Sequence, residues 1–221
     1  MIIDELIVEI TRRCNMNCKH CLRGYAQNKD MDYNTMVKIL TNIDSIGLVI
    51  FTGGEPSLNV QGLKDFLRLC KDKSIPIGSF YIATNGTNSE DFIDVIFDLY
   101  NYCLDKKSSH IDISRSHYHY EQDEEMIKKL KCLSFVKERK EYFSPLKREG
   151  KSLKGKPVEI IPLELEDNIV KGNVYLNVNG DICSSCDLSY ESQDKYKIGN
   201  IHRQTLQNIL VEGENYEQFS N

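Results

Sequence analysis

Three cysteines lie close together near the start of the chain, in the segment TRRCNMNCKHC. Cys14, Cys18 and Cys21 have the spacing Cys-x3-Cys-x2-Cys, which lets one loop place three thiols around one metal centre. A structural zinc site needs four ligands, and His20 is adjacent to Cys21, where it rarely reaches the same ion. A cubane iron–sulfur cluster takes one thiolate per iron, normally four. Three thiolates leave one iron open to a non-protein ligand, so the spacing favours a reactive iron–sulfur centre.

A second candidate site is the segment FTGGEP, residues 51–56, at the end of a predicted strand. Gly53 and Gly54 carry no Cβ, so the backbone there can approach a ligand closely. Polar backbone groups of this turn, together with Glu55, can receive an ammonium group, and Pro56 fixes the exit from the turn. Alone, this segment fits any turn between a strand and a helix. The cysteine segment upstream is what gives it a chemical meaning.

The two segments together resemble the radical S-adenosylmethionine (radical SAM) superfamily, with FTGGEP about thirty residues after the last of the three cysteines. The resemblance implies that Cys14, Cys18 and Cys21 hold a 4Fe-4S cluster whose open iron is chelated by the amino and carboxylate groups of S-adenosyl-L-methionine. It implies that an electron passed through the cluster cleaves the sulfonium. The products are methionine and a 5′-deoxyadenosyl radical, which abstracts hydrogen from a substrate. Gly53, Gly54 and Glu55 match the family position for the methionine part of SAM.

Further positions match the family less specifically. Thr84 and Asn85, in ATNGT, end the third predicted strand, and Ser114 and Arg115, in ISRS, end the fourth. The resemblance implies that these residues line the SAM site, because β-α folds place their sites at the carboxyl ends of parallel strands. The alternatives are an Asn-Gly turn in the first case and a surface arginine in the second. His20 stands where the family commonly has an aromatic residue near the adenine, and an imidazole can also stack or hydrogen-bond there.

The segment SRSHYHY adds two histidines just beyond the fourth predicted strand. His117 and His119 are two residues apart and could bind a metal, shuttle protons or contact substrate. A polar loop without a chemical role is the alternative. We identify no second catalytic residue, and Tyr118, Tyr120 and the remaining cysteines are only candidates for controlling a substrate radical.

Cys183 and Cys186 form a Cys-x2-Cys pair, a spacing that favours a metal site. Residues 173–210 resemble the C-terminal extension of SPASM and Twitch radical SAM enzymes, which holds auxiliary iron–sulfur clusters. No cysteine follows Cys186, and the three other cysteines are expected to be small buried hydrophobic residues. Three interpretations stay open: a cluster completed by a distant cysteine or by substrate, a zinc or intermolecular site, and a remnant with free thiols. The other cysteines are Cys70, Cys103 and Cys132.

Strands and helices alternate along most of the chain, which predicts parallel β-α units with the sheet buried by helices. A helix after the third strand is expected to be capped by Asn88, with Asp91 at the N3 position. Less clear strands are expected within 134–143 and 157–163. The clearer predictions are strands at 6–10, 48–54, 79–87 and 110–114, and helices at 33–47 (closed by Gly47), 60–72 and 121–133.

The character of the chain changes after residue 167. NVYLNVNGDIC predicts two short strands around the turn Asn179-Gly180, KYKIGNI a returning strand and TLQNIL a short helix. We therefore expect a radical SAM core at residues 1–167 and a SPASM/Twitch-like extension at 168–221. The resemblance implies an α/β fold, a partial (β/α)6 TIM-like barrel open on one side. The extension is expected to be a small β-hairpin and helix appendage.

Charge and composition narrow the function classes. The net charge of −5 argues against binding nucleic acid by bulk electrostatics. Residues 128–156 nevertheless hold eleven Lys or Arg residues against three Glu, which indicates either a solvated surface or a site for an anionic ligand or acidic peptide. The chain contains no run of 18 apolar residues, so no membrane span is predicted. MIIDELIVEI contains no Lys or Arg, so we expect no secretion signal and a cytoplasmic protein. In the cytoplasm, clustered cysteines bind metal more often than they form disulfides.

These observations predict a radical SAM enzyme, and a barrel too short to close suits a peptide or protein substrate. A reducing electron donor is a further expected partner. The alternatives are a small-molecule substrate such as a nucleoside or sugar, and an activase that installs a glycyl radical in a partner enzyme. A non-catalytic iron–sulfur redox sensor is the alternative from another class. FTGGEP and ATNGT speak against it, because a sensor needs no SAM pocket.

Overall fold

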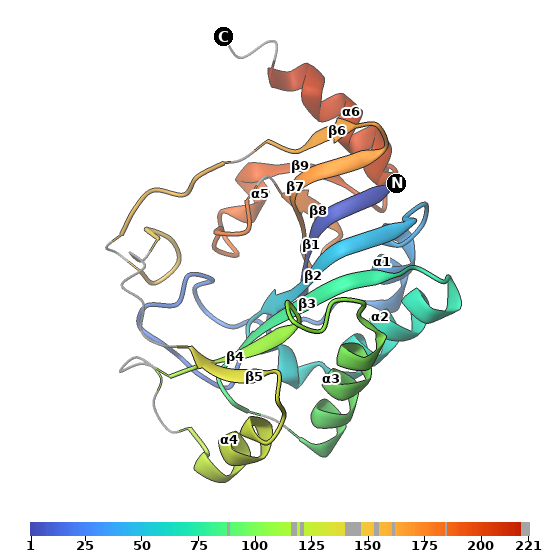
Figure 1. The fold of residues 1–221 in the computed structure, drawn as a ribbon. Coiled ribbons are helices and arrows are strands. Elements are labelled where there is room, and N and C mark those ends of the chain that lie inside the picture. Colours follow the sequence, from blue (N-terminus) through green and yellow to red (C-terminus); the bar gives the residue numbers. More distant parts are fainter. Residues whose placement is uncertain are drawn as a thin grey trace.

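The computed structural model describes residues 1–87, 89–115, 119, 122–139, 147–152, 155–160, 162–183 and 185–217 (Figure 1). Its strands form one sheet in the order β5-β4-β3-β2-β1-β7-β8-β9, with β6 paired to β7. β5 and β9 are the two ends of this path, so within the described residues the sheet does not close into a full barrel. The predicted partial barrel is confirmed. No described helix is long and apolar enough to cross a membrane.

The first five strands are parallel and are connected by helices that lie on one side of the sheet (Figure 1). β1 is buried on both faces along most of its length, as a continuous apolar segment in a parallel sheet should be. The strands are β1 (Ile2–Thr11), β2 (Ser45–Gly53), β3 (Ile77–Thr84), β4 (His110–Ser114) and β5 (Val136–Arg139). The helices are α1 (Tyr33–Ile39), α2 (Val60–Asp72), α3 (Glu90–Tyr102) and α4 (Glu124–Lys131), with a short 3-10 helix, η1 (Pro56–Leu58), after β2.

The C-terminal part extends the same sheet beyond β1. β7 (Ile169–Leu176) runs parallel to β1, with Ile7 opposite Tyr175. The predicted hairpin around Gly180 is confirmed, since β8 pairs with β7 in the antiparallel direction and Gly180 has φ +79. The predicted returning strand and the short helix are also present. The remaining elements are β6 (Glu164–Glu166), β8 (Asp181–Cys183), α5 (Gln193–Tyr196), β9 (Lys197–Asn200) and α6 (Leu206–Glu217).

The sixth parallel strand is therefore β7. The strand expected within 157–163 is not found in its described residues, 157–160 and 162–163. Pro157 and Pro162 bracket that segment, and proline cannot donate to a β-ladder.

Three local predictions are corrected by the structure. The helix expected at 33–47 ends at Ile39, because Asn42 adopts φ +69, and Gly47 lies within β2. Ser89 caps α3 by accepting a hydrogen bond from the Phe92 amide at 3.1 Å, whereas Asn88 lies outside the described residues. The third concerns Cys132, which was expected to be buried but is exposed at the end of α4.

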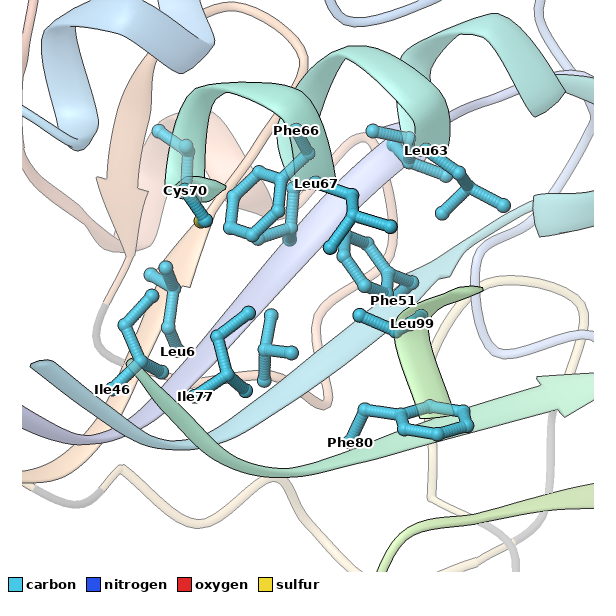
Figure 2. Packing of buried hydrophobic residues seen from close by; sticks show 14 of the residues in the cluster. Leu6, Ile46, Phe51, Leu63, Phe66, Leu67, Cys70, Ile77, Phe80 and Leu99 are labelled. Atoms are coloured by element: carbon cyan, nitrogen blue, oxygen red, sulfur yellow. The ribbon is translucent and has the colours of Figure 1, made fainter. Parts of the chain in front are cut away.

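The hydrophobic core lies between the helices and the sheet. Figure 2 shows Leu63, Phe66 and Leu67 of α2 directed toward the strands. The ring of Phe66 meets that of Phe51 from β2 edge-to-face, with centroids 5.1 Å apart. Cys70 is part of this core and Cys103 is also buried, as expected of small apolar side chains. This packing fixes the strands whose carboxyl ends form the site.

Candidate active site

A pocket of about 370 Å³ lies at the carboxyl ends of the parallel strands. Parallel β-α folds place their ligand sites at this edge, because loops from neighbouring strands converge there. Most of the residues singled out in the sequence line it. They are Cys14, Cys18, His20, Cys21, Gly53, Gly54, Glu55, Thr84, Asn85 and Ser114.

The cysteine loop leaves the sheet at the end of β1 and returns to it. The Thr11 hydroxyl donates to Asp30 Oδ1 at 2.6 Å, and the Arg12 amide donates to the Lys29 carbonyl at 2.8 Å. At the other end the Lys151 amide donates to the carbonyl of Cys21 at 2.9 Å. These hydrogen bonds close the loop at its base and hold the three thiols over the pocket. A residue that follows β5 in the chain thus supports the cysteine loop directly.

The three thiols are free and half-buried. Burial raises the pKa of Cys14 to about 11 and also raises the pKa of Cys18. A bound metal reverses this preference, because it takes the thiolate form and releases the proton. No three His, Cys, Asp or Glu side chains of the described residues converge on a point suited to a single ion. Three cysteines that line one pocket suit a cubane, in which each thiolate binds a different iron.

The glycine pair lets the β2 turn pack against the cysteine loop. A Cβ at Gly53 would lie 1.9 Å from the Thr11 carbonyl oxygen, and one at Gly54 would lie 2.1 Å from that of Arg13. Gly53 also has φ +132, where a side chain is strained. The Gly54 amide donates to the Thr11 carbonyl at 2.9 Å. The backbone of the cysteine loop therefore lies beside both glycines, and both glycines also line the pocket.

Glu55 is a buried carboxylate, 1% exposed, at the wall of the pocket. Its Oε1 accepts from the Thr84 hydroxyl at 2.7 Å and from the Ser57 amide at 3.1 Å, and Oε2 accepts from the Asn85 amide at 2.7 Å. Burial raises the pKa of Glu55, while these hydrogen bonds act in the opposite direction. Thr84 and Asn85 therefore reach the pocket and also fix the carboxylate there. A buried, oriented carboxylate of this kind suits an ammonium group.

The ends of β4 and β5 differ from expectation in two arginines. Ser114 lines the pocket, whereas Arg115 is not among the described residues that do. The Arg115 guanidinium pairs with Glu124 at 2.6 Å and with Glu138 at 3.3 Å. Arg139, the last residue of β5, lines the pocket and was missed. The sequence placed Arg139 in the middle of the segment 134–143, so no local signal marked it as the carboxyl end of the strand.

Two histidines meet inside the pocket. His20 and His119 both line it, and their rings lie edge-to-face with centroids 5.3 Å apart. Burial, together with the charges of His20 and Arg139, lowers the pKa of His119. His119 is therefore a neutral imidazole near neutral pH. His117, Tyr118 and Tyr120 lie outside the described residues.

The second cysteine pair lies in the C-terminal part of the sheet. Cys183 is fully buried beside Ile7, Tyr175 and Leu188, and burial raises its pKa to about 12. Cys186 is half-buried and free, with its Sγ 4.0 Å from an oxygen of Asp187. Two thiols supply half the ligands that a four-iron cluster normally has. Within the described residues, no third His, Cys, Asp or Glu completes a metal site with them.

Two family models match the chain. The model of the radical SAM superfamily matches residues 8–131, and that of the iron-sulfur cluster-binding domain named SPASM matches residues 168–221. The chain therefore belongs to the radical SAM superfamily and carries a C-terminal SPASM iron–sulfur domain. The cofactors of these families are a 4Fe-4S cluster with SAM and an auxiliary iron–sulfur cluster.

Curated relatives are similar over a short stretch only. A tungsten-containing aldehyde ferredoxin oxidoreductase cofactor-modifying protein of Pyrococcus furiosus is 34% identical over 88 residues, 37% of this chain and 24% of that protein. A GTP 3′,8-cyclase of Clostridium acetobutylicum is 36% identical over 91 residues, 38% of this chain and 28% of the cyclase. A 7-carboxy-7-deazaguanine synthase of the same organism is 37% identical over 87 residues, 37% of this chain and 38% of the synthase. The matched stretch thus spans well under half of each relative.

Solved structures share the fold over nearly the whole chain. The structure described as native anSMEcpe with bound AdoMet and Cp18Cys peptide has a TM-score of 0.57 at 16% identity and covers 97% of this chain and 82% of that one. The same protein with bound AdoMet and Kp18Cys peptide has a TM-score of 0.51 at 15% identity and covers 98% and 82%. At this identity the similarity establishes the fold alone.

Proposed function

We propose that this protein reductively cleaves SAM at a 4Fe-4S cluster held by Cys14, Cys18 and Cys21, and abstracts hydrogen from a peptide or protein substrate. The cluster and SAM supply the electron transfer and the radical chemistry. The single observation that carries the proposal is that the three thiols line one pocket together with the buried carboxylate of Glu55. That arrangement provides for both a cluster with an open iron and a ligand that bears an ammonium group.

The chain's own residues orient SAM and shape the pocket. Glu55 receives the ammonium group, and Thr84 and Asn85 hold its carboxylate in place through the hydrogen bonds already described. Arg139 brings a positive charge to the pocket wall, which suits a carboxylate. His20 offers an imidazole face for the adenine.

A peptide substrate is supported by the open sheet and by the structural neighbours. The described strands end at β5 on one side and β9 on the other, and a sheet that does not close suits a substrate larger than the pocket. The neighbouring structures hold AdoMet together with a peptide, as their descriptions state.

We also propose a division into a core of residues 1–167 and an extension of residues 168–221. The turn at Asp167 and Asn168 supports it, since both residues have positive φ, 51° and 64°, between β6 and β7. β7 nevertheless pairs with β1, so the two parts share one sheet. The extension therefore completes the fold as well as following the core.

The main alternative is a small-molecule substrate. It is favoured by the names of two curated relatives, a GTP 3′,8-cyclase and a 7-carboxy-7-deazaguanine synthase. Hydrogen abstraction transfers a hydrogen atom from the substrate to the 5′-deoxyadenosyl group. If the substrate is deuterated, the deuterium appears in 5′-deoxyadenosine and shows which fraction contained the substrate.

The test is to supply the reconstituted protein with SAM, dithionite and either the protein fraction or the small-molecule fraction of a perdeuterated extract of the source cells. We expect deuterium in 5′-deoxyadenosine with the protein fraction only, read by mass spectrometry. Deuterium from the small-molecule fraction alone would establish the alternative. A triple alanine variant of the three cysteines controls for cleavage that does not depend on the cluster.

Replacing Glu55 by glutamine tests the ammonium site. The amide keeps an oxygen that can accept from Thr84 but loses the negative charge, so SAM should bind about 10- to 100-fold more weakly, roughly 1.4–2.8 kcal/mol. Anaerobic calorimetry on the reconstituted protein measures this. Because burial raises the pKa of Glu55, wild-type affinity should fall as the pH is lowered through that raised pKa. The glutamine variant should lack this dependence.

A matched control is Glu124→Gln, which removes an exposed carboxylate that pairs with Arg115. It should leave the SAM affinity unchanged. Equal affinity of wild type and Glu55→Gln would rule out Glu55 as the ammonium ligand.

A further inference from the structure

Residues 147–152, the connecting segment, follow β5 in the chain and lie against the end of the cysteine loop. The Lys151 amide donates to the Cys21 carbonyl at 2.9 Å. A Cβ at Gly150 would lie 2.3 Å from the Leu22 carbonyl oxygen and 2.6 Å from that of Cys21. Gly150 has φ +59, a conformation that glycine adopts without strain. The connecting segment therefore packs directly on the backbone that carries the third cysteine.

Glu149 joins the connecting segment to residues 187–192, the SPASM loop, which follows Cys186 directly. Its Oε2 accepts from the Ser189 amide at 3.0 Å and from the Ser192 hydroxyl at 2.8 Å. Ser192 precedes α5, but its hydroxyl does not cap that helix. One carboxylate oxygen of the core thus holds two groups of the C-terminal domain.

Other contacts complete this arrangement. The Lys147 ammonium pairs with Asp187 at 3.2 Å, a second link between the connecting segment and the SPASM loop. The Tyr190 amide donates to the Arg23 carbonyl at 3.2 Å, and the Arg23 guanidinium donates to the Leu188 carbonyl at 2.6 Å. The end of the cysteine loop, the connecting segment and the SPASM loop therefore each contact the other two.

The Glu149 carboxylate is held in its charged form. Burial raises its pKa, but the hydrogen bonds from Ser189 and Ser192 outweigh burial and leave the pKa below its ordinary value. Hydrogen bonds to an ionised acceptor are about twice as strong as those between neutral groups. Glu149 therefore holds the SPASM loop more firmly than an uncharged side chain of the same shape would.

We propose that Glu149 is a positioning residue for the first cluster, the one proposed at Cys14, Cys18 and Cys21. By holding the SPASM loop against the connecting segment, it fixes the backbone of Cys21. This inference rests on the proposed function, because it requires a cluster at those cysteines. Each thiolate of a cubane binds a different iron, so a displaced cysteine weakens the whole site. The SPASM domain thus helps to hold the first cluster, independently of metal at its own cysteine pair.

The test compares wild type, Glu149→Ala and Glu149→Gln in the Cys183→Ala/Cys186→Ala background, where bound iron belongs to the first cluster. The reconstituted proteins are mixed anaerobically with the ferrous-iron chelator bathophenanthroline disulfonate, and iron release is followed by absorbance. Iron should leave Glu149→Ala about tenfold faster than wild type, the size of effect usual for groups that orient a metal ligand. Glu149→Gln should be intermediate, because its amide keeps an oxygen but no charge.

Electron paramagnetic resonance of the dithionite-reduced cluster gives a second measurement that does not depend on the stability of the fold. The spectrum of Glu149→Ala should differ from that of wild type, because Cys21 is displaced, and Glu149→Gln should restore most of the wild-type spectrum. Ser192→Ala should also speed iron release. It should add little in the Glu149→Ala background, because both changes remove the same hydrogen bond.

Glu191→Ala is the matched control, since it removes an exposed carboxylate of the same loop. It should release iron at the wild-type rate. Thermal unfolding of the metal-free proteins establishes that each variant is folded at the assay temperature. If Glu149→Ala is not, Glu149→Gln is compared with Glu191→Gln in its place.

Release of iron at the wild-type rate from a folded Glu149→Ala would overturn the proposal, as would equal acceleration by Glu191→Ala. Where Glu149→Gln decides, a wild-type rate of iron release from that variant overturns it. A wild type that binds no cluster would instead refute the proposed function, and this inference with it.

Discussion

Replacing Cys14, Cys18 and Cys21 together by alanine is expected to remove about four irons per chain and to abolish formation of 5′-deoxyadenosine from SAM. The three thiols are the metal-binding side chains proposed for the first cluster, and a cubane with one open iron needs all three thiolates. Colorimetric iron and sulfide assays measure the loss of the cluster. The fold should persist, because the thiols are half-buried in a loop and are not part of the hydrophobic core.

Cys132→Ala is the matched control, since it removes an exposed thiol that does not line the pocket and should not change the iron content. Iron that remains in the triple variant would belong to the C-terminal thiols. It should then disappear when Cys183 and Cys186 are also replaced by serine. Cleavage of SAM by the triple variant would contradict the assignment of the cluster ligands.

Gly53→Ala is expected to have the largest effect on the fold of the site. Its Cβ would lie 1.9 Å from the Thr11 carbonyl oxygen and its backbone has φ +132. A strained backbone conformation costs about 1–3 kcal/mol, and forced overlap in a packed region costs about the same again. We expect the free energy of unfolding to fall by roughly 3 kcal/mol, and the cysteine loop to be displaced with loss of cluster binding. Thermal unfolding of the metal-free protein and iron content after reconstitution measure the two effects.

Gly24→Ala separates the two contributions. Gly24 also has positive φ, +91, but a Cβ there would lie 3.8 Å from the nearest atom, the Cα of Gly150. That variant should lose about 1 kcal/mol from backbone strain alone and keep its cluster. If Gly53→Ala were no less stable than Gly24→Ala, the close packing of the β2 turn on the cysteine loop would be wrong.

The sequence was sufficient for those parts of the fold that depend on local patterns. Apolar segments predicted β1 to β4, with glycine or asparagine turns marking the ends of β2 and β3, and Asn179-Gly180 predicted the hairpin. The pocket walls at Thr84, Asn85 and Ser114 were expected from the family resemblance, in agreement with the rule that parallel strands end at one edge of the sheet. Each of these predictions needed only neighbouring residues.

Long-range features were not accessible in this way. Nothing in the segment 169–176 indicates that it pairs with the free edge of β1, because a buried strand looks alike beside any partner. The hydrogen bonds from Arg12 to Gln193 and from Arg23 to the Leu188 carbonyl depend on contacts across most of the chain. The same holds for the close packing of the glycine pair against Thr11 and the cysteine loop.

The central claim is that the pocket binds SAM and that the chain cleaves it. The most direct test is to reconstitute the protein anaerobically with iron and sulfide, add SAM and dithionite, and measure 5′-deoxyadenosine and methionine. We predict that both products form in equal amounts and only when the cluster is present. A protein that holds its cluster but forms no 5′-deoxyadenosine would contradict the account and would favour a non-catalytic redox sensor.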